Sequence, residues 1–172
     1  MISPCENLGP VENFDLLLTT MQPYIDMLEA SEDSKFGFLG RQLPDGSIDY
    51  GEHGTIKPAP NPEDWTIWRE GVDKDLLLSY IRDYKKYNFA RIRLLKTAPN
   101  IKHYSWHKDP SSRLHIPLIT NPDALMFFIV DEAITPFHLT AGNLWLTRTK
   151  IKHTASNKGT TNRYHIVYEF FT

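Results

Sequence analysis

The stretch YSWHKDPSSRLHIPLITNP, residues 104–122, places two histidines, an aspartate and an arginine in a strand-like run. Burying so many polar side chains is costly unless they are paired or bind a metal. Residues two apart on a strand point to the same face, so His107 and Asp109 are expected to project together. By the same alternation Arg113 and His115 share a face. These residues are either ordinary surface residues of a β-protein or one wall of a metal site.

The chain on both sides of this stretch is rich in predicted strands from about Asn88 onward. These segments are short, carry many β-branched and aromatic residues, and are separated by Pro, Asn, Gly or Ser. The predicted strands are ARIRLL (90–95), RLHIPLI (113–119), ALMFFIVD (124–131), NLWLTRT (143–149) and RYHIVYEFF (163–171).

The first part of the chain, before about residue 88, has the pattern of helices and a hairpin instead of many short strands. Between Val11 and Ala30 apolar residues recur at intervals of three and four, which predicts two short helices separated at Pro23. Residues 36–51 read as a hairpin around a Pro-Asp-Gly turn, and residues 57–64 as an extended loop. A further helix is predicted to begin near Asp73, whose side chain can cap the free amides.

Helices followed by many short strands favour an α+β fold that is mainly β, a β-sandwich or jelly roll with N-terminal helices packed on one sheet. With 172 residues, of which 41% are hydrophobic and 23% charged, the chain fits one domain with a sizeable core. We expect a single domain over residues 1–172. Its N-terminal part, 1–90, holds helices and a hairpin, and 91–172 holds the metal-binding core.

Composition argues against several classes of partner. The formal net charge of −2 provides no global positive field for nucleic acid or an anionic membrane. One basic segment, RDYKKYNFARIRLLK (82–96), is expected to be the solvated side of a helix that runs into a strand. The longest apolar run, ALMFFIV (124–130), is far below the roughly 20 residues that span a membrane, and is expected to be a buried strand.

The expected location is cytoplasmic. The single cysteine, Cys5, cannot form an internal disulfide, and residues 1–10 lack a basic region followed by an apolar stretch.

Further along the chain, His153 supplies a second histidine that can join the His107–Asp109 pair, and Arg163 follows ten residues later (163 − 153). Two neutral imidazoles and a carboxylate form the facial triad of non-haem Fe(II) oxygenases, which leaves metal positions open for cosubstrate and oxygen. Each residue also has an ordinary explanation: His115 and His165 as core histidines, Arg113 and Arg163 as surface arginines. The joint order of these residues on strand-like segments favours the metal site.

These segments together resemble the aspartyl/asparaginyl β-hydroxylase family of Fe(II)- and 2-oxoglutarate-dependent oxygenases, which includes free-proline hydroxylases. The resemblance runs from about Arg91 to Glu169. The matching pieces are HKD (107–109), RLHIPLITN (113–121), HLTAGNLW (138–145) and HTASNKGTTNRYHIVYE (153–169). It implies a double-stranded β-helix, the cupin-like jelly roll, with Fe(II), 2-oxoglutarate and O2 as cofactor and cosubstrates.

The resemblance also assigns roles to residues. It implies that His107, Asp109 and His153 bind Fe(II) and that Arg163 holds the far carboxylate of 2-oxoglutarate, which suits a planar guanidinium. Arg113 and His115 match positions near the C1 carboxylate of 2-oxoglutarate or a carboxylate of the substrate. The candidates for the walls of the substrate cavity are Trp106, Trp145, Phe137 and Ile116, with Trp106 and Arg113 expected to contact the substrate.

The implied activity is hydroxylation of a C–H bond in an amino acid or a peptidyl residue of the Asp, Asn or Pro type, with release of succinate and CO2 and stimulation by ascorbate. The expected partner is a small-molecule amino acid or a peptide or protein, with the oligomeric state left open. Two other classes fit the same residues: a cupin-type enzyme that holds Mn, Ni or Zn, and a non-catalytic jelly-roll binding module with structural histidines.

Overall fold

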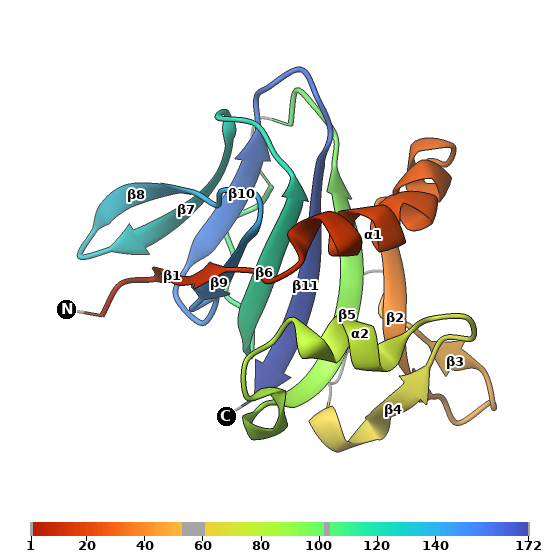
Figure 1. Cartoon of the computed structure of the whole chain (residues 1–172). Coiled ribbons are helices and arrows are strands. Elements are labelled where there is room, and N and C mark those ends of the chain that lie inside the picture. The colour runs from red at the N-terminus through yellow and green to blue at the C-terminus, as the bar shows by residue number, and fades with distance from the viewer. Residues whose placement is uncertain (1, 53–60, 102–103, 172) are drawn as a thin grey trace.

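The computed structural model describes residues 2–52, 61–101 and 104–171 of the chain (Figure 1). The helices are α1 (Phe14–Glu29) and α2 (Lys74–Ser79), with short 3-10 turns η1 (Pro62–Asp64) and η2 (Tyr84–Lys86). The first strands are β1 (Cys5–Pro10), β2 (Lys35–Gln42), β3 (Ile48–Asp49), β4 (Trp65–Trp68) and β5 (Asn88–Thr97). The others are β6 (Ser112–Ile119), β7 (Ala124–Val130), β8 (Ala133–His138), β9 (Asn143–Thr147), β10 (His153–Asn157) and β11 (Arg163–Phe171).

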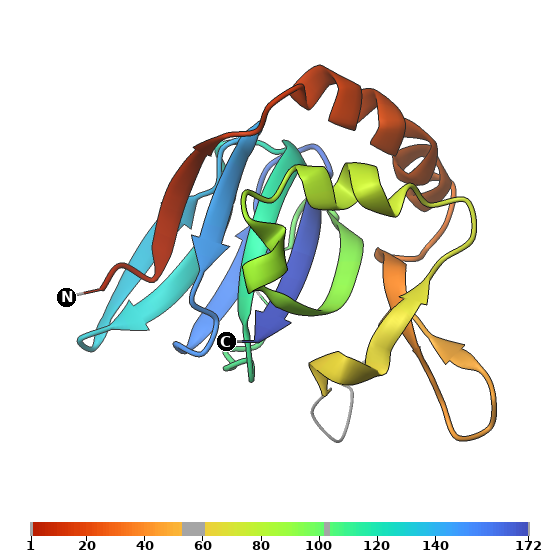
Figure 2. The ribbon, with the colours of Figure 1, turned by 60° about the horizontal axis from the view of Figure 1, so that its bottom comes forward.

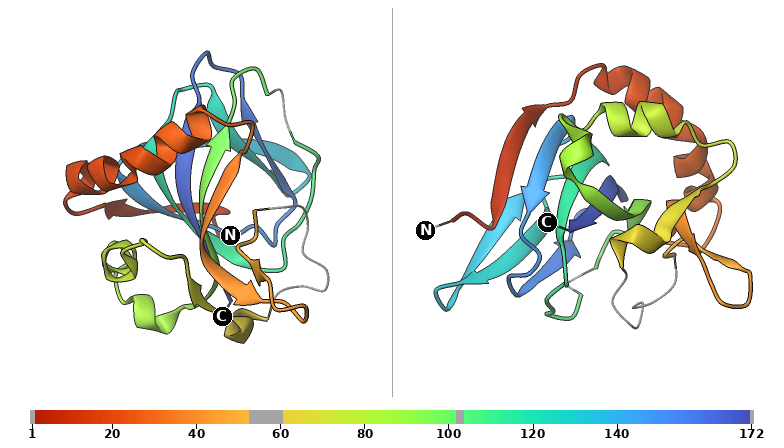
Figure 3. Two further views of the ribbon diagram at one scale, coloured as in Figure 1. Left: turned by 90° about the vertical axis from the view of Figure 1, so that its right-hand side faces the viewer. Right: turned by 90° about the horizontal axis from the view of Figure 1, so that it is seen from below.

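The strands form two sheets. The large sheet has the order β1-β9-β6-β11-β5-β2-β3, with β4 also paired to β2, and the small sheet has the order β10-β7-β8. Both helices cover one face of the large sheet, and the small sheet lies toward the other face (Figures 2 and 3). This confirms the expected mainly-β, cupin-like fold with N-terminal helices on one sheet.

The two faces of the large sheet differ in chemistry. The face toward the helices is apolar: Ile92, Leu94, Ile116 and Ile166 are fully buried in one cluster with Leu17 of α1 and other helical side chains. Arg93, Val167, His115 and Trp145 are register partners across β5, β11, β6 and β9. Because side chains alternate along each strand, this row lies on the opposite, inner face. The inner face is where the polar residues gather.

The prediction of two helices in the first part of the chain is wrong. Residues 14–29 form one helix that contains Pro23, and its buried stripe of Leu17, Met21 and Ile25 continues past the proline. Packing of this stripe on the sheet outweighs the lost hydrogen bond at Pro23. The helix predicted at Asp73 is confirmed, since the Asp73 carboxylate accepts a hydrogen bond of 2.9 Å from the backbone N–H of Leu76.

The five predicted strands of the second part are confirmed, and the hairpin of residues 36–51 is present as β2 and β3. β7 is buried only at alternate positions, Ala124, Met126 and Phe128, because just one of its faces packs in the interior. Residues 57–60 of the predicted loop lie outside the described residues, and 62–64 form η1. Strands β1, β4, β8 and β10 were not predicted.

The N-terminal part contributes to the large sheet as well as covering it. β1 pairs with β9 and β2 pairs with β5, so strands from the first ninety residues flank the central strands on both sides. None of the helices in the described part of the chain has the length and apolar content needed to span a bilayer.

Candidate metal centre

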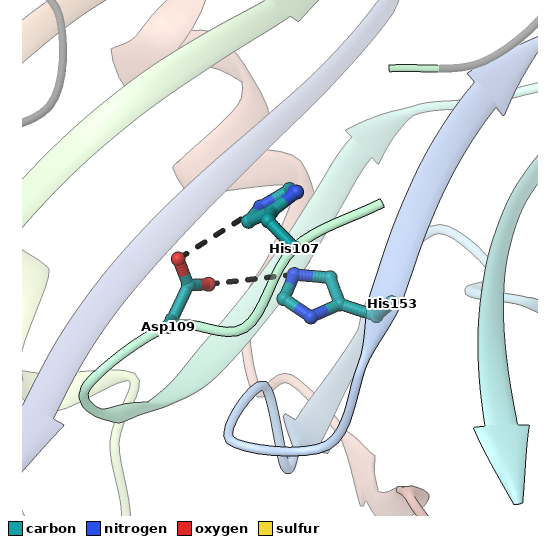
Figure 4. Close-up of side chains that lie close together, drawn as sticks. All are labelled: His107, Asp109 and His153. Carbon is teal, nitrogen blue, oxygen red and sulfur yellow. Dashed lines mark ion pairs between the residues drawn. The ribbon is translucent and has the colours of Figure 1, made fainter. Parts of the chain in front are cut away.

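The side chains of His107, Asp109 and His153 lie close together (Figure 4). One ligand atom from each residue, an imidazole nitrogen or a carboxylate oxygen, falls within 4.8 Å of the other two. Nε2 of His153 is 3.4 Å from Oδ2 of Asp109, and Nε2 of His107 is 3.8 Å from Oδ1. The structure therefore brings together the three residues that the sequence analysis proposed as ligands.

Backbone pairing, rather than strand alternation, positions these side chains. His107 belongs to no regular strand and forms an isolated bridge with His153, in which each backbone N–H donates to the other's carbonyl, at 3.0 and 2.9 Å. Asp109 lies in the irregular segment before β6, where its backbone N–H donates a hydrogen bond of 2.9 Å to the carbonyl of Thr149. The expectation that the pair projects from one face of a single strand is thus wrong, although the two side chains do converge.

Second hydrogen bonds select the tautomer of both imidazoles. Nδ1 of His107 lies 2.7 Å from the carbonyl oxygen of Ser105, and Nδ1 of His153 lies 3.0 Å from that of Ile151. A carbonyl only accepts, so Nδ1 carries the proton in each neutral ring and Nε2 presents a lone pair. Such second contacts are typical of metal-binding histidines.

Two Nε2 lone pairs consequently face a carboxylate. Acceptors this close repel each other unless a proton or a metal cation lies between them, so the donor set fits a divalent cation. Burial by itself would raise the pKa of Asp109, but nearby polar and charged groups, Arg113 among them, lower that pKa to about 2. The carboxylate is ionised and ready to bind a cation.

Arg113 supports Asp109 directly. Its Nη2 forms an ion pair of 2.8 Å with Oδ2 of Asp109, and the two side chains are largely buried. Arg113 and His115 share the inner face of β6, as expected from their spacing. Outer partners of this kind orient a metal ligand and strengthen its binding.

Arg163 is buried at the start of β11 on the same inner face. It is 4% exposed, its Nε has no hydrogen-bond partner among the described residues, and no carboxylate in that part of the chain forms an ion pair with it. Burial lowers the pKa of Arg163 to about 10, so the guanidinium remains charged at neutral pH. A buried cation without an anion is costly, and a ligand carboxylate would relieve that cost.

His115 and His165 form a buried pair on the same face. Their Nδ1 atoms lie 3.4 Å apart, and both Nε2 atoms lack a partner among the described residues. Burial, followed by the charge of Arg163, lowers the pKa of each imidazole well below its usual value. Both rings are therefore neutral and have spare capacity to bind a ligand.

A second group of buried charges was missed in the sequence analysis. Arg91 and Arg93, 7% and 3% exposed, lie on the inner face of β5, so the interpretation of this basic segment as a solvated face is wrong for both. Arg91 forms an ion pair with Glu169, whose other oxygen accepts a hydrogen bond of 2.7 Å from Ser111. Their spacing of two within a strand that alternates with buried Ile92 and Leu94 was the available signal.

The four residues predicted to line the substrate cavity lie in different places. Trp106 is half-buried next to His107, and Trp145 lies in the inner row with His115 while its Nε1 donates to the Thr140 carbonyl at 3.3 Å. Phe137 packs edge-on against Phe128, and Phe128 stacks on the His153 ring with centroids 5.5 Å apart. The placement of Ile116 in the cavity is wrong, because alternation turns it to the helix-covered face.

A family model, described as Aspartyl/Asparaginyl beta-hydroxylase, matches residues 76–172, more than half of the chain. The chain belongs to the aspartyl/asparaginyl β-hydroxylase family. Membership confirms the expected family of 2-oxoglutarate–Fe(II) hydroxylases and implies these two cofactors. No curated protein matches the chain in sequence.

Solved structures share the fold of this β-hydroxylase family member. A prolyl-4-hydroxylase from Pseudomonas putida has a TM-score of 0.59 at 11% identity, over 97% of this chain and 91% of that one. A prolyl hydroxylase from Trichoplax adhaerens, in complex with a hypoxia inducible factor peptide, has a TM-score of 0.61 at 12% identity, over 98% and 83%. AviO1 from Streptomyces viridochromogenes has a TM-score of 0.58 at 16% identity, over 98% and 90%.

At such identities the likeness concerns the fold alone. The chain spans 44% of the length of two further matched structures, a non-heme monooxygenase in a nickel complex and a 2OG-Fe(II) oxygenase from Burkholderia pseudomallei. Within the β-hydroxylase family, the described triad is the candidate Fe(II) site, and the buried cation Arg163 is the candidate for the far carboxylate of 2-oxoglutarate.

Proposed function

We propose that this protein is an Fe(II)- and 2-oxoglutarate-dependent dioxygenase that hydroxylates a C–H bond of an amino acid or of a peptidyl Asp, Asn or Pro residue. The observation that carries the proposal is the arrangement of His107 and His153, whose Nε2 lone pairs are directed at Asp109 by hydrogen bonds on Nδ1. Family membership supports the same function, as does the buried Arg163, which has no ion pair with a carboxylate of the described residues.

Four residues form the proposed Fe(II) site. His107, Asp109 and His153 would hold Fe(II), and Arg113 keeps the Asp109 carboxylate oriented. When bound, Fe(II) and 2-oxoglutarate supply, with O2, the oxidising power that inserts one oxygen atom into a C–H bond, while 2-oxoglutarate leaves as succinate and CO2.

The remaining residues prepare the surroundings of the metal. Arg163 would clamp the far carboxylate of 2-oxoglutarate, a pairing that suits a planar guanidinium in a buried site. His115 and His165 stay neutral, so they can donate or accept a hydrogen bond without adding charge. Phe128, stacked on the His153 ring, excludes water from one side of that ligand.

Succinate formation tests the proposal. The purified protein should convert 2-oxoglutarate to succinate with Fe(II) and ascorbate, and Mn(II), Ni(II) or Zn(II) in its place should give none. Mass spectrometry of a panel of L-proline, L-aspartate, L-asparagine and short peptides should then find one product that has gained one oxygen. A protein that binds Fe(II) but forms no succinate with any panel member would contradict an oxygenase function.

A further inference from the structure

Among the described residues, the inner face of the large sheet carries more positive charge than nearby carboxylates neutralise. Four buried or largely buried arginines, 91, 93, 113 and 163, face two carboxylates, Asp109 and Glu169. Glu169 pairs with Arg91, and Asp109 pairs with Arg113. Among the described residues this leaves Arg93 and Arg163 without a carboxylate.

The ligands of the proposed function account for only one of these two cations. One carboxylate of 2-oxoglutarate would bind Fe(II), which leaves only its far carboxylate for an arginine, and that carboxylate suits Arg163. In that complex Arg93 would still lack a carboxylate partner among the described residues. A buried, uncompensated guanidinium destabilises the folded protein, which favours a second anionic ligand.

Arg93 is held in place for such a ligand. It is 3% exposed, its Nη1 donates to the carbonyl of Gly51 at 3.0 Å, and its Nε has no partner among the described residues. On the β2 side the register partner of Arg93 is Gly37. On the β11 side its partner is Val167, which in turn is paired with His115 of β6. The guanidinium therefore stands in the same inner row as the residues beside the candidate metal site.

Neighbouring charges agree with this placement of Arg93. Burial lowers the pKa of Arg93 to about 9, as do the charges of Arg91 and Arg113, while Glu169 and Asp109 oppose this effect. The pKa of Lys35, on the adjacent strand β2, is lowered by burial and then by the charges of Arg93, Arg91 and Arg113. Lys35 and Arg93 are therefore close enough to the ion pair of Arg113 with Asp109 for its charges to affect them.

We propose that Arg93 binds a carboxylate of the substrate and thereby selects acids over the corresponding amides. This inference rests on the proposed function and narrows its substrate class. Two sources of the carboxylate share this chemistry: the α-carboxylate of a free amino acid and the side chain of a peptidyl aspartate. In either case Arg93 would meet the carboxylate of the substrate. Arg113 is paired with Asp109, and its own contact with the substrate stays a separate prediction.

Matched acid and amide pairs test the proposal by calorimetry. The protein is titrated, with Zn(II) and 2-oxoglutarate present so that no turnover occurs, with L-proline against L-prolinamide. The second pair is N-acetyl-L-aspartic acid α-amide against N-acetyl-L-asparagine amide, which differ only in the side-chain carboxylate. The variants are Arg93→Gln, Arg93→Lys and, as a matched control at an exposed arginine, Arg82→Gln.

Wild-type protein and Arg82→Gln should bind the acid of one pair at least about tenfold more tightly than its amide. The pair that shows the preference identifies the source of the carboxylate. Arg93→Gln should reduce that preference to about twofold or less, with 2-oxoglutarate affinity unchanged within about twofold. Arg93→Lys should keep part of the preference, because it retains the charge and loses the planar fork. If circular dichroism shows that Arg93→Gln is unfolded, the acid preference of Arg93→Lys is compared with that of wild-type protein instead.

Three results would overturn the proposal: an acid preference that survives Arg93→Gln, a wild-type protein that prefers neither acid, or a parallel loss of 2-oxoglutarate binding that makes Arg93 a cosubstrate residue. Failure of the proposed function is distinguishable. In that case wild-type protein does not bind 2-oxoglutarate. A preference for the acid that depends on Arg93 would still support a carboxylate-binding role for Arg93.

Discussion

Nε2 of His153 and Oδ2 of Asp109 lie 3.4 Å apart, and both atoms are acceptors in the tautomer that the Ile151 carbonyl selects. The two residues come from separate segments, joined by backbone bonds from His107 to His153 and from Asp109 to Thr149. The fold therefore holds two electron-rich atoms against each other. A bound cation would turn this repulsion into attraction, so occupancy of the site should affect both binding and stability.

Removal of the distal ligand should eliminate metal binding. His153→Ala is expected to fold normally, because the backbone bridge with His107 does not use the side chain, and to lose Fe(II) binding and turnover. Metal analysis after anaerobic purification measures the loss. His138→Ala, a histidine of β8 outside the triad, is the matched control and should keep its iron. Full Fe(II) affinity in His153→Ala would refute the ligand assignment.

Arg163 should control cosubstrate affinity. Losing a charge-assisted pair to a buried carboxylate costs about 2–5 kcal/mol, so Arg163→Ala should weaken 2-oxoglutarate at least about tenfold while Fe(II) still binds. Calorimetry with Zn(II) or the Michaelis constant for 2-oxoglutarate measures this effect. Arg148→Ala, a partly exposed arginine paired with Glu6, is the control. An unchanged Michaelis constant in Arg163→Ala would disprove the clamp.

Arg113 should act on the metal through Asp109. Loss of an outer partner typically lowers metal affinity about 10- to 100-fold, so Arg113→Met should weaken Fe(II) binding by that amount. Arg113→Lys retains the charge and should lose less. The ratio of succinate to hydroxylated product in Arg113→Lys tests a second role. A ratio near one agrees with a supporting residue, whereas excess succinate would show that Arg113 also contacts the substrate.

The buried histidine pair should make the protein less stable in mild acid. The pKa values of His115 and His165 are lowered in the folded state, so below about pH 6.5 the unfolded chain binds more protons. The free energy of unfolding should then fall with decreasing pH, by at most about 1.4 kcal/mol per pH unit for each histidine.

The change of the free energy of unfolding with pH can be measured by denaturant unfolding at half-unit steps from about pH 7.5 to about pH 5. This range covers both sides of the pKa of a histidine in the unfolded chain. His165→Gln, which cannot titrate, should show a smaller slope than wild-type protein. Equal slopes in the two proteins would mean that His165 is protonated in the folded state, contrary to its buried position.

Local sequence patterns predicted much of the fold because they depend on neighbours along the chain. β11 has the predicted bounds, 163–171, since six of its nine residues are Ile, Val, Tyr or Phe, which favour a strand. The cap at Asp73 and the turn between β2 and β3 are also local features. Pro23 was misread because the burial that stabilises α1 on both sides of it comes from the sheet, which the helix sequence does not contain.

The position of Ile116 was predictable and was missed. Alternation along β6 places it opposite His115, so the two residues cannot line one cavity. The burial of Arg91 and Arg93 was harder to predict, because alternation places the two arginines on one face of the strand but does not show that both faces of the sheet are covered.

By itself the sequence determined the chemistry available to this protein: a His-x-Asp pair, a later histidine, an ordered set of arginines and strands to carry them. Only the tertiary structure decided which of these charges are paired. Arg113 is occupied by Asp109 and Arg91 by Glu169, whereas Arg93 and Arg163 lack a carboxylate in the described part of the chain. The physical reason is that ion pairing and burial depend on distances between strands that are remote in sequence, and only the folded sheet brings those strands together.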